Sequence, residues 1–138
     1  MEDLKLNSFA AAVHENAVAH GWWEEERGLP EVLMLCVSEL AEALEEYRSG
    51  RPTLYYLNER TQQENVHTTE KVGADGRINV MPHMERSKKP EGVAVELADC
   101  VIRILDYCGH AGIDIEEAIR IKHEYNKTRP YRHGGKKC

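Results

Sequence analysis

Apolar residues recur at helical spacing in four segments of the chain. The first predicted helix covers about residues 6–20 and ends at Gly21. The second covers about residues 28–50, and Pro30 lies in its first turn, where the missing N–H removes no helical hydrogen bond. The apolar side of this helix consists of Leu33, Val37, Leu40, Leu44 and Tyr47.

Two further helices are predicted in the second half of the chain. The third covers about residues 89–109 and opens with Lys89-Pro90-Glu91-Gly92. Its polar residues form one narrow stripe, and almost everything else on it is apolar, which indicates that other helices surround it. The fourth begins at Asp114, whose side chain can cap it while Glu117 completes a capping box, and Pro130 stops it. The polar stripe of the third helix consists of Glu96, Asp99, Arg103 and Asp106.

Residues 51–89 interrupt the helical pattern. Most of this segment is polar, but Lys71-Val72 and Ile78-Asn79-Val80 flank Asp75-Gly76, a pair typical of a type I′ hairpin turn. We interpret the segment as an inserted loop or small β-hairpin and not as a second domain. The prediction is therefore a single all-α domain over residues 1–138, a four-helix-type bundle with this insertion between its second and third helices.

Composition excludes several classes of function. At 138 residues, with 41% hydrophobic and 30% charged residues, the chain has the balance of a soluble globular domain. The net charge of -6 argues against a surface built for nucleic acid, and no apolar run approaches the roughly 20 residues that cross a bilayer. The first residues lack the pattern of a secretion signal, and the cysteines are widely spaced with no C-x-x-C pair. We therefore expect a cytoplasmic protein with reduced cysteines and no thiolate-bound zinc.

A short acidic motif, Glu-Leu-Ala followed by Glu or Asp, occurs in both the second and the third predicted helix. Its copies are Glu39-Leu40-Ala41-Glu42 and Glu96-Leu97-Ala98-Asp99. A spacing of three residues puts both carboxylates of a pair on one helix face, so two such helices facing each other would gather four acidic side chains. Like charges at close range disfavour ionisation, and a divalent cation removes this conflict. Oxygen ligands alone suit Mg²⁺, Mn²⁺ or Ca²⁺, whereas zinc and iron usually recruit His or Cys. The repeat predicts a hard-metal site, with Mg²⁺ as the leading ion.

Two interpretations of these acids stay open from the pattern alone. A single E-x-x-E on a helix is usually a solvated face, but the third predicted helix has almost no solvated side to spare. A carboxylate among apolar groups costs several kcal/mol unless it is paired or binds a metal. The alternative is a thin solvent seam in which Arg103 pairs with Asp99 or Asp106 along the helix.

Candidate contacts for a phosphate-containing substrate lie elsewhere in the chain. Near the end of the fourth predicted helix a Lys, an Asn and an Arg share one face, and a histidine follows in a basic tail at residues 130–138. Cations at a helix C-terminus also suit the helix dipole, which is the alternative explanation for them. Two adjacent tryptophans after the first helix either stack on a base or pack at the end of the bundle. These candidates are Trp22, Trp23, Lys122, Asn126, Arg129 and His133.

With these residues assembled, the chain resembles the MazG-like, all-α nucleoside triphosphate pyrophosphohydrolases. The signature of that family is E-E-x-x-E followed by E-x-x-D on paired helices, which matches Glu39 and Glu42 and then Glu96 and Asp99. The family also carries a Lys and an Asn with a following basic residue after the acidic helices, which is a supporting similarity.

The resemblance covers most of the chain, about residues 6–50 and 90–133. It departs from the family at Ser38, where the signature has its first Glu, so one outer metal contact is either missing or supplied by Glu45 or Glu46. The segment between the acidic pairs is also longer than is usual in the family. This extra length can lengthen helices, cover the site or mediate assembly.

The resemblance implies hydrolysis of a nucleoside or deoxynucleoside triphosphate to the monophosphate and pyrophosphate, in nucleotide-pool housekeeping. The two acidic pairs would hold Mg²⁺ or Mn²⁺, and a water deprotonated by one of these carboxylates or a neighbouring one would attack the α-phosphorus. Lys122 and Arg129 would balance charge on the pyrophosphate, and Asn126 would hydrogen-bond sugar or phosphate. Family members are dimers or dimers of dimers, so we expect a homodimer or a dimer of dimers with bundles completed between chains. The catalytic candidates are Glu39, Glu42 and Glu46.

Other function classes stay open beside this one. The Ser38 departure makes a non-catalytic nucleotide- and Mg²⁺-binding helical oligomer, acting as a sensor, an alternative. A purely structural helical dimer with its acids on a solvent seam is another. Nucleic-acid binding is supported only by the basic residues near the C-terminal end and is the weakest hypothesis.

Overall fold

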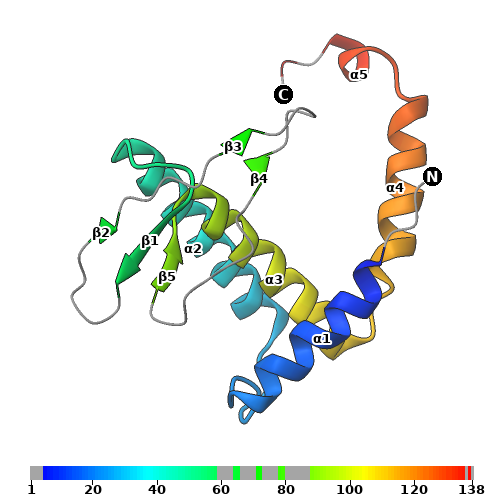
Figure 1. The fold of residues 1–138 in the computed structure, drawn as a ribbon. Coiled ribbons are helices and arrows are strands. Elements are labelled where there is room, and N and C mark those ends of the chain that lie inside the picture. The colour runs from blue at the N-terminus through cyan, green and yellow to red at the C-terminus, as the bar shows by residue number, and fades with distance from the viewer. Residues whose placement is uncertain are drawn as a thin grey trace. The chain divides into compact units, whose positions relative to one another are not determined.

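The computed structural model describes residues 5–58, 64–65, 71–72, 78–79, 88–135 and 137, and it is mainly helical (Figure 1). The four long helices are the ones that the sequence predicts, each within a few residues of the expected ends. No helix in the described part of the chain is long and apolar enough to span a membrane. The helices are α1 (Leu6–Ala19), α2 (Leu29–Arg48), α3 (Val93–Ala111), α4 (Ile115–Thr128) and the short α5 (Arg132–Gly135).

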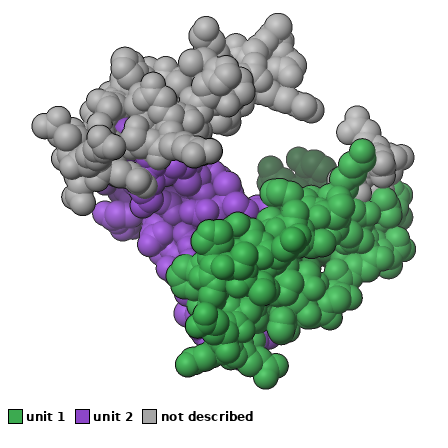
Figure 2. Space-filling view, turned by 60° about the horizontal axis from the view of Figure 1, so that its bottom comes forward, with its two compact units in different colours: residues 1–27, 104–138 green, residues 28–103 purple. Residues whose placement is uncertain are grey.

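The chain divides into two compact units (Figure 2). The central unit comprises residues 28–103, and the terminal unit comprises residues 1–27 together with residues 104–138. Helix α3 contributes its first part to the central unit and its last part to the terminal unit. The single domain that the sequence predicts stays a prediction.

In the central unit, α2 buries a different side from the one that its largest apolar residues predict. The buried side carries small or medium side chains, and the Cys36 thiol lies 4.0 Å from the Cys100 carbonyl oxygen of α3. The apolar side that the sequence gives is instead exposed, from 49% at Leu40 to 76% at Tyr47. The buried side is Val32, Cys36, Glu39 and Ala43, and the exposed stripe is Leu33, Val37, Leu40, Leu44 and Tyr47.

A three-stranded antiparallel sheet lies between α2 and α3 in the sequence. Its strands, in the order β2-β1-β5, are β2 (Glu64–Asn65), β1 (Tyr55–Asn58) and β5 (Lys88–Glu91). The prediction that residues 89–92 open the third helix was wrong. Pro90 pairs with Tyr56 in the edge strand β5, where a residue without an N–H is tolerated. Gly92 then turns the chain into α3 with a φ of +113°.

The predicted hairpin in the insertion is confirmed as a pair of strands. Strands β3 (Lys71–Val72) and β4 (Ile78–Asn79) run antiparallel, with Lys71 opposite Asn79 and Val72 opposite Ile78. The turn expected at Asp75-Gly76 lies outside the described residues.

In the terminal unit, residues of α1 and α3 form a small core. Ala10, Leu105 and Cys108 are buried together, and Leu6 and Ile115 pack against them. Because Ile115 is the first residue of α4, this core also anchors the start of that helix.

Helix α4 begins at the predicted cap. The Asp114 side chain accepts a hydrogen bond from the Glu117 backbone N–H at 3.1 Å, and the Asn7 side chain of α1 donates to the same oxygen at 2.8 Å. The helix ends at Thr128, just before Pro130, as the stop signal predicts.

We expect Gly109→Ala to destabilise the terminal unit. A Cβ atom at this position of α3 would lie 2.8 Å from both the Ala10 carbonyl oxygen and the His14 Cβ atom, so α1 would have to move away. Overpacking of this kind should lower the free energy of unfolding by about 1–3 kcal/mol, measured by urea titration. Helix propensity alone predicts a gain of about 1 kcal/mol, so a stabilised variant would contradict the close approach of the two helices.

Candidate metal centre

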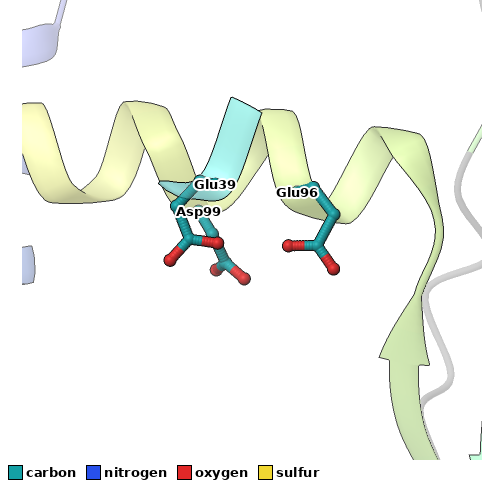
Figure 3. Close-up of side chains that lie close together, drawn as sticks. All are labelled: Glu39, Glu96 and Asp99. Carbon is teal, nitrogen blue, oxygen red and sulfur yellow. The ribbon is translucent and has the colours of Figure 1, made fainter. Parts of the chain in front are cut away.

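Two buried carboxylates, one on α2 and one on α3, mark the candidate site in the central unit. Glu39 and Glu96 are 6% and 8% exposed, and no other charged side chain is buried among the residues whose burial the structure describes. With Asp99 they form a cluster in which one carboxylate oxygen from each residue lies within 4.8 Å of the others (Figure 3). Glu42 is exposed, and its carboxyl group contacts those of Glu39 and Glu96. The structure thus brings all four predicted metal ligands together.

Arg103 compensates the charge of one of these carboxylates. Its Nε atom donates to Glu39 Oε1 at 2.6 Å, from α3 to α2. The solvent-seam alternative has Arg103 pairing along its own helix with Asp99 or Asp106, whereas the observed ion pair joins the two acidic helices. Glu96 and Asp99 are left without a cationic ion-pair partner in the described part of the chain.

The surroundings of the three carboxyl groups shift their pKa values in different directions. Burial, and then the contacts with Glu39 and Glu42, raise the pKa of Glu96 from 4.5 to about 7. Burial and the charge of Glu39 also raise the pKa of Asp99. Burial acts on Glu39 in the same direction, but the hydrogen bond and charge of Arg103 outweigh it and lower the pKa of Glu39. The cluster therefore carries more negative charge than its protein surroundings stabilise.

A second group of carboxylates adjoins the first and shares Glu96 with it. One oxygen from each of Glu46, Glu91 and Glu96 lies within 4.8 Å of the other two. Glu46 belongs to α2, and Glu91 ends β5 immediately before the turn into α3. The hydroxyl of Tyr55, which is 2% exposed, lies 2.9 Å from both carboxylate oxygens of Glu46 and donates to that group. This bond fixes the orientation of Glu46.

The sequence pattern missed Glu91 as a member of the site. It has no helical spacing to Glu96, and its place comes from the pairing of β5 with β1, in which it lies opposite Tyr55. Lys89 Nζ pairs with Glu91 Oε1 at 2.7 Å. A lone glutamate before a glycine is too common a pattern to mark a ligand. Glu45, considered from the sequence as an outer contact, is exposed and belongs to neither carboxylate group.

The two tryptophans have different surroundings in the terminal unit. Trp23 donates its Nε1 hydrogen to Asp106, at 3.0 and 3.1 Å from the two carboxylate oxygens, and stacks on His110 with ring centroids 4.0 Å apart. Trp22 is 59% exposed, and the Arg27 guanidinium carbon lies 5.2 Å from its ring centroid. Packing accounts for Trp23, whereas Trp22 presents an open ring.

The predicted phosphate contacts on α4 lie near Tyr125. Lys122 Nζ is 4.9 Å and Arg129 Cζ is 5.8 Å from the centroid of this ring. Asn126 is the next residue along the helix and is exposed. The side chain of His133 lies outside the described residues. These contacts belong to the terminal unit, and the acidic residues belong to the central unit.

Comparison with known proteins assigns no family to this geometry. A scan against protein-family models found no match, and searches of curated proteins and of solved structures found no significant match. The chemistry of the site follows from its donor atoms, their burial and their charge.

The donor set fits a hard divalent cation. All the clustered ligand atoms are carboxylate oxygens, the donors that Mg²⁺ and Mn²⁺ prefer. Glu96 is only 8% exposed, and the hydrogen bonds of its carboxyl group are with the carboxyl groups of Glu39 and Glu42. Ionising a carboxyl group that is buried beside other carboxyl groups costs free energy, and a bound cation would offset that cost.

Proposed function

We propose that the protein is a Mg²⁺-dependent nucleoside triphosphate pyrophosphohydrolase of the MazG-like kind. The main support is the gathering of Glu39, Glu42, Glu96 and Asp99, in which the carboxyl group of buried Glu96 contacts those of Glu39 and Glu42. The same four residues make up the acidic signature by which the chain resembles that family. The proposed substrate is a nucleoside or deoxynucleoside triphosphate of the cytoplasmic pool.

In this proposal the reaction is hydrolysis at the α-phosphorus. The two acidic pairs would hold Mg²⁺, which when bound would supply positive charge to the phosphates and lower the pKa of a water molecule. A carboxylate accepts the proton of that water as its oxygen bonds to the α-phosphorus. The bond to the oxygen that bridges the α- and β-phosphates breaks, and pyrophosphate leaves with that oxygen. The proposal gives this role to Glu46, whose carboxylate accepts a hydrogen bond from the Tyr55 hydroxyl.

The substrate contacts keep the roles that the resemblance implies. Lys122 and Arg129 balance the charge of the departing pyrophosphate, and Asn126 hydrogen-bonds sugar or phosphate. Trp22 stacks on the base, for which its exposed ring is suited. Trp23 takes part only by supporting this region, since its ring and N–H are already used in packing.

A homo-oligomer is part of the same proposal. The exposed stripe of α2 has a counterpart on α3, where Leu97 and Val101 are 47% and 50% exposed. Apolar surface on two neighbouring helices is typical of an interface. A second copy of the chain covers both helices and completes a four-helix-type bundle from α2 and α3 of each chain.

We expect Leu40→Arg to convert this oligomer into monomers. Leu40 belongs to the exposed stripe of α2, so an arginine there would bury an unpaired charge in the proposed interface. Analytical ultracentrifugation measures the change in mass. Glu45→Arg is the matched control, since Glu45 is exposed on the same helix but outside the stripe. A wild-type protein that stays monomeric at high concentration would contradict the interface.

Product identification tests the proposed reaction. With Mg²⁺ and a panel of ribo- and deoxynucleoside triphosphates, we expect the wild-type protein to release pyrophosphate and a monophosphate. Glu39→Ala and Glu96→Ala should release neither, while Glu45→Gln should match the wild type because Glu45 lies outside both carboxylate groups. Orthophosphate with a diphosphate product would place the attack at another phosphorus and contradict the proposal.

The second candidate is a helical oligomer that binds nucleotide and Mg²⁺ without turnover. The ion pair between Arg103 and Glu39 favours it, because one of the metal ligands already has a cationic partner. Thermal stabilisation by Mg²⁺ with nucleotide, in the absence of any product, would support such a sensor. A melting temperature that does not respond to Mg²⁺ would leave only the structural dimer.

A further inference from the structure

We propose that Cys36 of α2 and Cys100 of α3 form a reversible disulfide bond that ties these two helices together beside the acidic residues. Both cysteines belong to the central unit, and each is 8% exposed. The Cys36 thiol lies 4.0 Å from the Cys100 carbonyl oxygen, and the two side chains contact each other. The proposed function gives these cysteines no role, and the disulfide does not depend on it.

Cys36 and Cys100 lie at the same level of two helices that run in opposite directions (Figure 1). Contacts with α3 proceed along α2 from Cys36 to Glu39, while on α3 they proceed backward from Cys100 to Glu96. Cys36 also belongs to the buried side of α2, as Glu39 does. The two thiols therefore face each other across the helix pair, which is the arrangement that a disulfide requires.

The dimensions of a helix pair suit this bond. Packed helices have axes about 8–10 Å apart, and Cα atoms lie about 2.3 Å from each axis, so facing Cα atoms are roughly 3.5–5.5 Å apart. A disulfide joins residues whose Cα atoms are about 4.4–6.8 Å apart. The other apolar residues on the buried side of α2 are Val32 and Ala43, so no large apolar side chain on that side of α2 separates the helices. Small shifts of the backbone are enough to close the bond.

The oxidant in this proposal is a peroxide, which is small enough to reach thiols that are largely buried. One thiol loses its proton, and its sulfur attacks an oxygen of hydrogen peroxide; the O–O bond breaks, which gives a sulfenic acid and, with that proton, water. The second thiol attacks the sulfenic sulfur, the S–S bond forms, and a second water leaves. Two thiols thus lose two electrons to the peroxide. A dithiol reductant restores both thiols by exchange.

The disulfide fixes the spacing of the two helices that carry the acidic pairs. Glu39 follows Cys36 by one helical turn, and Asp99 directly precedes Cys100. The bond closes a loop that contains residues 37–99 and therefore the whole insertion. A cross-link across so long a loop removes much of the entropy of the unfolded chain, so oxidation stabilises the packing of α2 against α3.

Peptide mapping of the oxidised full-length protein tests this bond. The folded protein is treated with hydrogen peroxide, its remaining thiols are alkylated in denaturant, and the digest is analysed by mass spectrometry without reduction. We expect the peptides that contain Cys36 and Cys100 to be joined, and dithiothreitol to separate them. Cys108 is 5% exposed in the core of the terminal unit and should be recovered as an alkylated thiol.

Thermal melting tests whether the bond fits the fold. The oxidised wild-type protein should melt about 5 °C or more above the reduced protein, because the cross-link destabilises the unfolded chain. Cys36→Ala and Cys100→Ala should each lose this shift, and one of them serves if the other folds poorly. Cys108→Ala removes a buried cysteine of the same helix α3 and should keep the shift, which makes it the matched control.

Three results would overturn the proposal. The first is alkylation of both Cys36 and Cys100 after treatment with peroxide. The second is a set of cross-links in which Cys36 or Cys100 joins Cys108 or Cys138 in similar amounts, because such links form from unfolded chains. The third is an oxidised wild type that melts no higher than the reduced protein, since the bond would then distort the helix pair. None of these measurements involves a nucleotide, so they are independent of the proposed hydrolysis.

Discussion

Glu96→Gln is expected to stabilise the metal-free protein near pH 8 and to remove Mg²⁺-dependent hydrolysis. Burial and the neighbouring carboxyl groups raise the pKa of Glu96 to about 7, so ionising this residue near pH 8 costs folding free energy. A glutamine has nearly the same shape and carries no charge to bury. As a neutral amide it is a poor ligand, and we expect kcat to fall about 10²-fold or more.

The pH dependence of stability isolates this effect. Between pH 4.5 and about 7 the folded protein keeps a proton on Glu96 that the unfolded chain releases. The contribution of Glu96 to stability is therefore complete below this window and is lost as the pH rises through it. In differential scanning calorimetry without metal, the wild type should lose several degrees of melting temperature relative to Glu96→Gln from about pH 5 to about pH 8.

Two comparisons control this result. Glu45→Gln makes the same chemical change at an exposed position and should follow the wild type at every pH. Mg²⁺ should raise the melting temperature of the wild type but not that of Glu96→Gln. A Glu96→Gln protein that melts earlier than the wild type near pH 8 would show that the Glu96 carboxylate is stabilised by the protein itself, against the metal centre.

Gly92→Ala is expected to have the largest effect on folding. Gly92 has a φ of +113°, and a Cβ atom there would lie against the Thr53 carbonyl oxygen and 2.8 Å from the Thr53 carbonyl carbon. The obstacle is backbone, and that carbonyl oxygen accepts the Ala94 N–H at 3.0 Å, so it cannot move without losing a bond at the start of α3. We expect a loss of about 3 kcal/mol or more in the free energy of unfolding, measured by urea titration.

Gly50→Ala is the matched control for Gly92→Ala. Gly50 also has a positive φ, +66°, but nothing lies within 4 Å of a Cβ atom added there. It should cost only the roughly 1–2 kcal/mol of a left-handed residue. Equal losses in the two variants would mean that the close approach of Gly92 to Thr53 contributes nothing.

The helices were predictable because their signals are local. Apolar periodicity, Pro30 in the first turn of α2 and the Asp114 cap of α4 all act within a few residues, and the structure confirms all four long helices. The sheet was not predictable in the same way. Strand β5 contains Pro90, and its strand conformation depends on pairing with residues far away in the sequence.

The buried side of α2 shows a second limit of pattern reading. The larger apolar residues of α2, such as Leu33 and Leu44, lie on the exposed stripe, while the smaller Cys36 and Ala43 face inward. Periodicity identifies both stripes but does not say which neighbour covers each. An apolar stripe that a partner chain covers has the same periodicity as one that packs against the chain's own core.

For the acidic pairs too, local spacing determined one part of the site and tertiary contacts determined the rest. Spacing alone placed Glu39 with Glu42, and Glu96 with Asp99, on single helix faces, since helix geometry relates residues three apart. The meeting of the two pairs, the ion pair of Arg103 with Glu39 and the presence of Glu91 all arise from contacts between separate elements. Local spacing was thus enough to nominate a hard-metal site, because it sets which ligands share a face. Burial, charge compensation and the strand-borne ligand depended on long-range packing, which alone determines the surroundings of each carboxylate.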